Sequence, residues 1–270
     1  MEPPLGKRIG NGRAAEVYEY GDGQVIKLWR ESGHEEWVAR EAQAQRAVIA
    51  AGVPAPAVIA ETEIEGRPAI VMARVDGLDG LTAAEQKPWR IWSIGKATGR
   101  LHRQLADVPA PPELPTLVGM ARHDITHSEN IPESARPRLL ALLERTPDGH
   151  ALCHLDFHPG NVMKTPVGYM VIDLANACAG DPAGDHAKSL LLLRVGSPAE
   201  VSAWERVLIT TGRRLMAAAY RRGYGSVDKH ALALWQPIVI AMRLKEGIPE
   251  ERASLLRMLS SSLRAAERSG

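Results

Sequence analysis

Hydrophobic and polar positions in the first third of the chain form short runs that are compatible with β-strands. Gly21-Asp22-Gly23, between the second and third runs, is a hairpin turn signal. A helix is predicted over residues 33–51, because Gly52 and Pro54 end it. The pattern predicts an antiparallel sheet with one helix inserted after its third strand. The predicted strands are residues 7–10, 15–20, 24–29, 58–60 and 69–72.

The rest of the chain is predicted to be mainly helical. Several prolines between residues 109 and 115 indicate a loop. Two short strands are expected near residues 162–163 and 169–173. Helices are predicted within 82–105 and over 134–145, 184–194, 199–222, 227–246 and 250–267. The fold class is therefore α+β, with an N-terminal sheet and a larger helical part.

Composition narrows the class of protein. The 270 residues are 45% apolar and 24% charged, with a formal net charge of +1, and this balance excludes a disordered chain. Aromatic residues make up only 4% of the chain and include one phenylalanine, Phe157, so the core is expected to consist of leucine, valine, isoleucine and alanine. That scarcity argues against base stacking, and no nucleic-acid partner is predicted.

Cysteine content and apolar runs predict a cytoplasmic protein with no membrane partner. The two cysteines, Cys153 and Cys178, are too few for a secreted disulfide framework and are interpreted as small core residues. The first residues contain no apolar stretch of the signal-peptide kind. The densest apolar run is residues 190–193, whereas a membrane span needs roughly 18 apolar residues.

Charge is distributed unevenly along the chain. Residues 188–270 carry 14 basic and 7 acidic residues, whereas the preceding residues are net acidic. Arg213, Arg214, Arg221 and Arg222 come as two pairs that a helix would place roughly on one face. These residues form either a set of solvated basic helix faces or a surface suited to an anionic ligand.

The strongest chemical signal is a loop that reads His154-Leu155-Asp156-Phe157-His158-Pro159-Gly160-Asn161, followed by Val171-Ile172-Asp173 at a strand end. We name residues 154–161 the motif loop. The spacing fits phosphoryl transfer: Asp156 can accept the proton of an attacking hydroxyl, and Asn161 and Asp173 can supply oxygens to a magnesium ion. The competing interpretation is a loop that uses Asp and Asn for turns and caps.

Upstream residues fit the same chemistry. Lys27 lies inside an apolar strand, where a lysine needs an anion or an outward position, and it is predicted to contact nucleotide phosphates. Glu41, on the following helix, is predicted to pair with it. Gly10 and Gly12 lie between the first two strands and could bring backbone amides near a phosphate, although a plain hairpin turn competes.

With these motifs the sequence resembles the aminoglycoside phosphotransferase and choline kinase-like family, which has a two-lobed protein kinase-like fold. The resemblance runs from about Leu5 to Leu193. It implies a nucleotide-binding lobe over residues 1–75, a catalytic and acceptor-binding lobe over 76–270, and the cofactors ATP and Mg²⁺. It also implies that Asp156 is the base, that Asn161 and Asp173 bind the metal, and that adenine lies near Met72 and Arg74.

The resemblance also implies roles for neighbouring residues. His154 is expected to brace the loop by hydrogen bonds; the alternatives are a catalytic acid or base, and a zinc site with His158, Cys153 and Cys178. Asp181 and Asp185 are expected to cap the next helix and brace the loop, the alternative being that they extend the metal site. Phe157 is expected to buttress the loop. Leu174 stands where many relatives carry an aromatic residue.

The predicted function is an ATP- and Mg²⁺-dependent small-molecule O-phosphotransferase that acts as a monomer or homodimer. Because residues 188–270 contain few carboxylates, a neutral or anionic hydroxyl compound fits better than a polycationic aminoglycoside. An antibiotic-modifying phosphotransferase and a non-catalytic pseudokinase are the alternatives. Trp204, Tyr220, Tyr224 and Trp235 either line an acceptor pocket or pack between helices.

Overall fold

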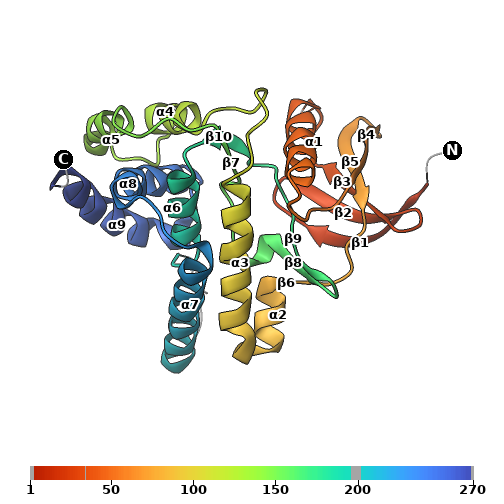
Figure 1. Cartoon of the computed structure of the whole chain (residues 1–270). Coiled ribbons are helices and arrows are strands. Elements are labelled where there is room, and N and C mark those ends of the chain that lie inside the picture. Colours follow the sequence, from red (N-terminus) through yellow and green to blue (C-terminus); the bar gives the residue numbers. More distant parts are fainter. Residues whose placement is uncertain (1–2, 34, 196–201, 269–270) are drawn as a thin grey trace.

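The computed structural model describes residues 3–33, 35–195 and 202–268. Its N-terminal part is an antiparallel sheet with strand order β1-β2-β3-β5-β4 (Figure 1). One helix, α1 (Glu35–Ala50), follows the third strand, so the predicted arrangement is confirmed. The strands are β1 (Leu5–Asn11), β2 (Ala15–Tyr20), β3 (Gln24–Trp29), β4 (Val58–Ile64) and β5 (Arg67–Ala73).

Strand β3 has apolar residues on both faces, because α1 covers one face and the other face has a core of its own. Val25 and Trp29 join a buried cluster with residues of α1. Ile26 and Leu28 belong to a second cluster on the opposite face. Side chains alternate between the faces of a strand, so Lys27 shares the side of Val25 and Trp29 and points toward α1.

The remainder is mainly helical, and Figure 1 shows these helices on the side of the molecule away from the sheet. The helices are α2 (Gly80–Gln86), α3 (Ile91–Leu105), α4 (Leu117–His127), α5 (Arg136–Leu143), α6 (Pro182–Leu192), α7 (Ala203–Tyr224), α8 (Lys229–Lys245) and α9 (Pro249–Arg268). The helix predicted over 199–222 corresponds to α7. Residues 199–201 of that prediction lie outside the described ranges.

Two helices, α2 and α4, are not predicted by the sequence pattern. The helix expected within 82–105 is α3, which ends at Leu105 as predicted. The additional helix α2 is separated from it by a 3₁₀ turn over Pro88–Arg90, because proline cannot donate the hydrogen bond that would continue α2. Helix α4 was not predicted, since it directly follows the proline-rich loop. Its N-terminus is capped by Thr116, whose side chain accepts a hydrogen bond from the Gly119 N–H.

Two small sheets hold the motif loop between them. The loop follows β7 (Ala151–Cys153), which pairs with β10 (Cys178–Gly180). It leads into β8 (Val162–Thr165), which pairs with β9 (Gly168–Val171) and with β6 (Leu78–Asp79). Both ends of the loop are therefore anchored in hydrogen-bonded strands.

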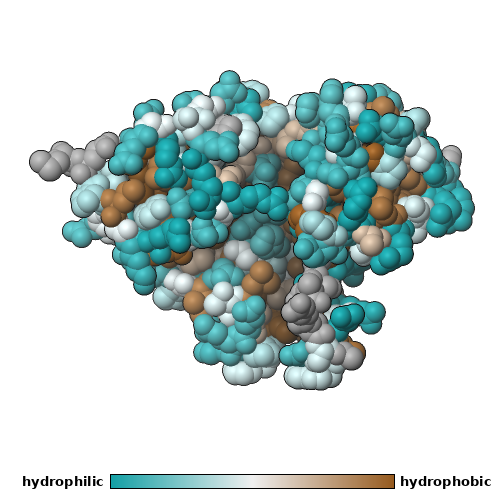
Figure 2. Space-filling view, turned by 180° about the vertical axis from the view of Figure 1, so that it is seen from behind, coloured by the Kyte–Doolittle hydropathy of each residue, from teal (hydrophilic) through white to brown (hydrophobic). Residues whose placement is uncertain are grey.

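Helices α3 and α7 lie side by side in the centre of the helical part (Figure 1). Glycine permits this closeness: a Cβ built at Gly99 would lie 2.1 Å from the backbone oxygen of Tyr220. Figure 2 shows the molecule from behind the view of Figure 1. Most residues on this face are hydrophilic, and the apolar residues form separate patches. Among the described residues, no helix has both the length and the apolar character needed to cross a bilayer.

Candidate active site

Lys27 lies at the centre of a charged cluster between the sheet and the helical part. Its Nζ is 2.8 and 2.9 Å from the two carboxylate oxygens of Glu41 on α1. The same Nζ is 2.7 Å from Oδ1 of Asp173, which follows β9. The orientation of Lys27 on β3 and the position of Glu41 on the covering helix make the first pair possible. The second pair joins residues 146 positions apart.

Burial and charge act in opposite directions in this cluster. Burial alone would lower the pKa of Lys27, but the carboxylates of Glu41 and Asp173 outweigh it and raise that pKa above its ordinary value. Burial disfavours the charged form of Asp173, yet Lys27 lowers the pKa of that carboxyl below its usual range. At neutral pH, Lys27 is therefore protonated and Asp173 ionised.

The motif loop brings the side chains of Asp156 and Asn161 into contact. Nδ2 of Asn161 is 2.9 Å from the backbone oxygen of Asp156 and 3.2 Å from its Oδ2. The side chain of Asp156 is one-third exposed, at 33%. His158 approaches the same carboxylate, with Nε2 3.8 Å from Oδ2. Asp156 is thus held in place and still reachable by a solvent-borne hydroxyl.

A buried carboxylate braces the loop from below. The side-chain oxygens of Asp185, on α6, accept hydrogen bonds from the backbone N–H of His154 at 2.6 Å and of Leu155 at 2.9 Å. His102 of α3 lies 2.9 Å from the same carboxylate. Leu155 has φ 57°, a left-handed conformation that costs a bulky residue free energy, and these bonds hold it there. The predicted bracing role of Asp185 is confirmed.

The other aromatic and sulfur residues around the loop are buried and packed. His154 is fully buried, and its Nε2 lies 3.1 Å from the backbone oxygen of Ile172. Phe157 is also fully buried and stacks on the ring of His102, with centroids 4.4 Å apart. Cys153 and Cys178 are free and buried. No group of three or more His, Cys, Asp or Glu residues suited to a metal exists in the described ranges, which leaves the zinc alternative unsupported there.

The donor set near Asp173 is suited to a hard cation. Because Nδ2 of Asn161 is turned toward Asp156, its Oδ1 is the atom left to face a ligand. The side chain of Asp173 remains 45% exposed although Lys27 contacts one of its oxygens. The amide oxygen of Asn161, a buried residue, and the exposed carboxylate of Asp173 are one neutral and one charged oxygen, the kind of ligands that Mg²⁺ prefers. The residues present therefore fit a magnesium ion.

The remaining predicted cofactor residues lie around the sheet. Gly10 is on β1, and the backbone N–H of Gly12 donates to the Ala15 oxygen at 2.9 Å, so these glycines form the β1–β2 hairpin. Met72 on β5 is buried, and its sulfur accepts a hydrogen bond from Gln45 at 3.3 Å. Arg74 pairs with the surface residue Glu19 at 2.7 Å. None of the described contacts joins these four to Lys27 or Asp173.

A cavity of about 480 Å³ opens beside Asp156, and α7 and α8 line it together with the motif loop. Arg213 of α7 and Arg243 of α8 contribute guanidinium groups to its wall. The sequence pattern singled out Arg213 only as part of a basic stripe and gave no signal for Arg243, which is 87 positions from Asp156. Tyr220, Tyr224 and Trp235 are buried between helices and do not line this cavity.

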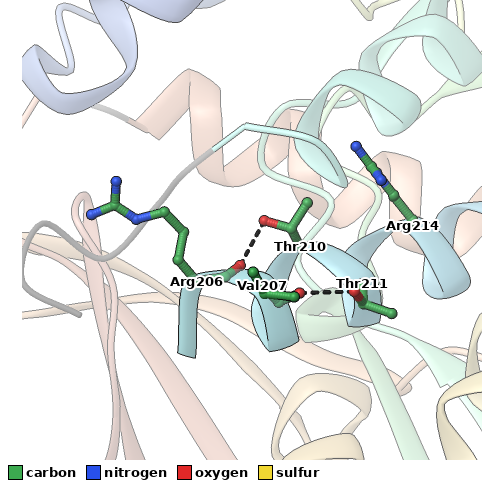
Figure 3. Close-up of a pocket in the computed structure, with 5 residues that line it drawn as sticks. All are labelled: Arg206, Val207, Thr210, Thr211 and Arg214. Carbon is green, nitrogen blue, oxygen red and sulfur yellow. Dashed lines mark hydrogen bonds between the residues drawn. The ribbon is translucent and has the colours of Figure 1, made fainter. Parts of the chain in front are cut away.

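A second hollow lies on another face of α7, next to residues Arg206 and Arg214 (Figure 3). The hydroxyls of Thr210 and Thr211 point along the helix there and donate to the backbone oxygens of Arg206 and Val207 at 2.7 and 2.8 Å. Those hydroxyls are engaged within the helix, and none of the groups predicted to react is near. The hollow therefore adds nothing to the candidate active site.

Comparisons with known proteins bear on the family and the fold of the chain. A family model described as the phosphotransferase enzyme family matches residues 6–235. No curated protein matches the chain at a significant level. One similar solved structure is a thermostable mutant of aminoglycoside phosphotransferase APH(4)-Ia in a ternary complex with AMP-PNP and hygromycin B. It has a TM-score of 0.65 and 16% identity, covering 96% of this chain and 92% of that one.

Two further solved structures are similar. The GDP complex of wild-type aminoglycoside 2'-phosphotransferase-IIIa has a TM-score of 0.62 and 14% identity, covering 98% of this chain and 94% of that one. A choline/ethanolamine kinase family protein from Mesorhizobium loti has a TM-score of 0.61 and 16% identity, covering 98% and 87%. At these identities the likeness shows the fold, and the predicted kinase-like fold is confirmed.

Proposed function

The chain belongs to the phosphotransferase enzyme family, and from that membership we propose that it transfers the γ-phosphoryl group of ATP to a hydroxyl of a small molecule. We also propose that residues 1–75 form a nucleotide-binding lobe and residues 76–270 a catalytic lobe, with the nucleotide between them. The observation that carries the proposal is the meeting of Lys27, from β3, with Asp173, which follows β9, at 2.7 Å. A cation and a carboxylate at this spacing suit a nucleotide phosphate and its metal.

In this proposal the side chains of the site hold the reactants in line. Lys27 binds nucleotide phosphate oxygens while Glu41 orients its ammonium group. Asn161 and Asp173 hold Mg²⁺, which neutralises charge on the phosphates. Asp156 accepts the proton of the acceptor hydroxyl as its oxygen bonds to phosphorus, and the bond from phosphorus to the leaving ADP oxygen breaks. Asn161 fixes the carboxylate of Asp156 for that step.

The proposal is tested with Asp156→Ala. Loss of a general base lowers turnover by roughly 100-fold or more, and ATP affinity should be nearly unchanged. Phosphate transfer and hydrolysis would be followed with radiolabelled ATP, and nucleotide affinity by calorimetry with and without Mg²⁺. Normal turnover in the variant would overturn the role of Asp156, and absence of Mg²⁺-dependent nucleotide binding in the wild type would overturn the function itself.

The non-catalytic alternative is distinguished by the same measurements. A nucleotide-binding pseudokinase would bind ATP and show no turnover that depends on Asp156. GTP is included beside ATP, because one similar solved structure holds an ATP analogue and another holds GDP. The intact set of Lys27, Asp156, Asn161 and Asp173 supports the catalytic proposal over the pseudokinase.

A further inference from the structure

The cavity beside Asp156 is the place where an acceptor hydroxyl would meet the proposed base. It lies among the motif loop, α2, α3, α7 and α8, and Asp156 and His158 stand on its wall. A volume of about 480 Å³ falls within the range of small-molecule sites. Its lining therefore indicates which chemical class of acceptor the proposed phosphotransferase can take.

Much of the lining is apolar. Leu81 of α2, Ile91 of α3, Leu193, and Ile209 and Met216 of α7 all face the cavity. Among the described lining residues, Asp156 is the one carboxylate. A polycationic acceptor would find a single negative group, already assigned to the hydroxyl, and aliphatic walls. The lining thus disfavours a multiply charged amine.

The two arginines on the wall differ in what holds them. Arg243 is bound by both carboxylate oxygens of Glu251, at 2.7 and 2.8 Å, and by Glu246 at 2.6 Å. Lys188 contacts the other oxygen of Glu246 at 2.9 Å. Two carboxylates therefore balance two cations in this network, and Arg243 brings little uncompensated charge to the cavity.

Arg213 is the group left over. It is half-buried, lines the cavity, and makes no ion pair or hydrogen bond with any residue in the described ranges. Burial lowers its pKa from the ordinary value, with a smaller opposing effect of Glu251, whose two carboxylate oxygens are bound by Arg243; a guanidinium keeps its charge at neutral pH. A half-buried guanidinium that makes no direct ion pair or hydrogen bond loses free energy that a bound anion would restore.

The geometry points to an acceptor that is an anionic alcohol. The hydroxyl would lie at Asp156, an aliphatic body would lie against the walls of α2, α3 and α7, and a carboxylate or similar anion would bind Arg213. This inference rests on the proposed function and adds to it the chemical class of the acceptor. It assigns Arg213 the role of specificity-determining residue.

Three alcohols with the same six-carbon chain test the inference: 6-hydroxyhexanoate, 1,6-hexanediol and 6-amino-1-hexanol. Binding is measured by saturation-transfer NMR on the whole chain, and phosphorylation by ³¹P NMR with ATP and Mg²⁺. We expect the carboxylate to bind best. In Arg213→Ala its dissociation constant should rise about 10- to 100-fold, as for loss of a charge-assisted hydrogen bond. Arg213→Glu should move the preference toward the amine.

Control variants keep the result specific. Arg214→Ala removes the neighbouring guanidinium, which lines the other hollow of α7, and should leave the ranking unchanged. Arg213→Lys keeps the charge and should retain part of the preference. Circular dichroism and thermal melting confirm that each variant is folded. ATP affinity should be equal in wild type and in every variant.

The outcomes separate the two proposals. Preferential binding of the carboxylate that depends on Arg213, without phosphate transfer to any acceptor, would support the inference and count against the proposed function. Turnover of ATP with equal binding of all three alcohols would keep the function and overturn the inference. Efficient phosphorylation of an aminoglycoside such as hygromycin B, or loss of ATP affinity in Arg213→Ala, would also overturn it.

Discussion

Two aspartates near the motif loop have different surroundings. Asp173 pairs with Lys27, and its side chain is 45% exposed toward the space between the sheet and the helices. Asp185 is 2% exposed and is surrounded by the backbone N–H groups of His154 and Leu155 and by the ring of His102. Both carry a pKa lowered below the usual range, against the effect of burial.

The comparison distinguishes a carboxylate that is open to a ligand, Asp173, from one that braces the loop, Asp185. Asp185 is enclosed in the protein and accepts three hydrogen bonds there, so it fixes the loop and is not exposed to a ligand. Asp173 keeps an oxygen that faces solvent, so it can bind a cation. Asp173 itself has φ 62°, and the left-handed backbone turns its carboxylate toward Lys27 at a cost in conformational energy. A lowered pKa alone does not identify a reactive carboxylate; accessibility distinguishes the two.

The largest effect is expected from Asp185→Asn. An amide places an NH₂ group where N–H donors of the loop now find an oxygen, and it removes the charge that His102 faces. Breaking a buried pair of this kind costs about 3–5 kcal/mol. Urea unfolding should show the loss. A free energy of unfolding within 1 kcal/mol of wild type would show that Asp185 does not brace the loop.

Asp173→Asn should have the opposite effect to Asp185→Asn: a large loss of activity and a small change in stability. If Asp173 binds the metal as proposed, removing its charge is expected to lower turnover by roughly 100- to 1000-fold, about 2.7–4 kcal/mol. Mg²⁺-dependent nucleotide binding, measured by calorimetry, should be lost. Stability should change by less than about 1 kcal/mol, because the partly exposed pair with Lys27 contributes little and Glu41 remains as its partner. Unchanged nucleotide binding would contradict the role of Asp173.

A pH dependence of stability is expected from His186, which follows the enclosed Asp185 on α6. Burial lowers the pKa of His186 to about 3, and its Nδ1 lies 3.1 Å from the hydroxyl of Tyr220. Below pH 6.5 the unfolded chain binds a proton there that the folded chain does not. The contribution of His186 to the free energy of unfolding should therefore be fully present above pH 6.5. It should fall by about 1.4 kcal/mol per pH unit as pH decreases toward 3.

The contribution of His186 is isolated with His186→Gln. The variant keeps a polar side chain that does not titrate, so its unfolding free energy should decline less steeply between pH 6.5 and 4. Unfolding is followed in urea at several pH values for both proteins. Identical slopes would show that His186 is not held neutral in the folded state.

The smallest effect is expected from Phe157→Leu. The ring of Phe157 stacks on His102 and meets the edge of the His154 ring at 5.2 Å between centroids. Loss of such aromatic contacts costs about 1 kcal/mol. Thermal melting should show a small decrease, and ATP affinity should be retained because the side chain is buried away from ligands. A large loss of ATP affinity would place Phe157 in the binding site.

Local sequence pattern predicted much of the fold. The short strands and the helix after the third strand were read correctly, since turn residues and a helix-ending glycine act over a few positions. Helix α4 is not predicted, because the prolines before it indicate a loop. The division between α2 and α3 is not predicted either, because Pro88 lies inside an otherwise helical pattern. The 3-residue strands β7 and β10 were missed because their pairing joins distant segments.

The candidate site is likewise predicted in part from local sequence and in part decided by contacts between distant segments. Spacing within the motif loop predicted Asp156, Asn161 and Asp173, and the structure brings Asp156 together with Asn161 and Asp173 together with Lys27. Their roles in catalysis and metal binding stay predictions. Arg243 and the free charge of Arg213 had no local signal, since a helix face says nothing about which carboxylates lie opposite it. Those partners come from α8 and α9.

By itself the sequence determined the family, the fold class and the residue types of the motif loop, because these depend on short spacings and on periodic burial. Only the tertiary structure decided which aspartate is enclosed and which is open, and which arginine is left without a carboxylate. The physical reason is that desolvation and ion pairing depend on distances between groups far apart in the chain. Such distances are fixed when α3, α6, α7 and α8 pack around the loop.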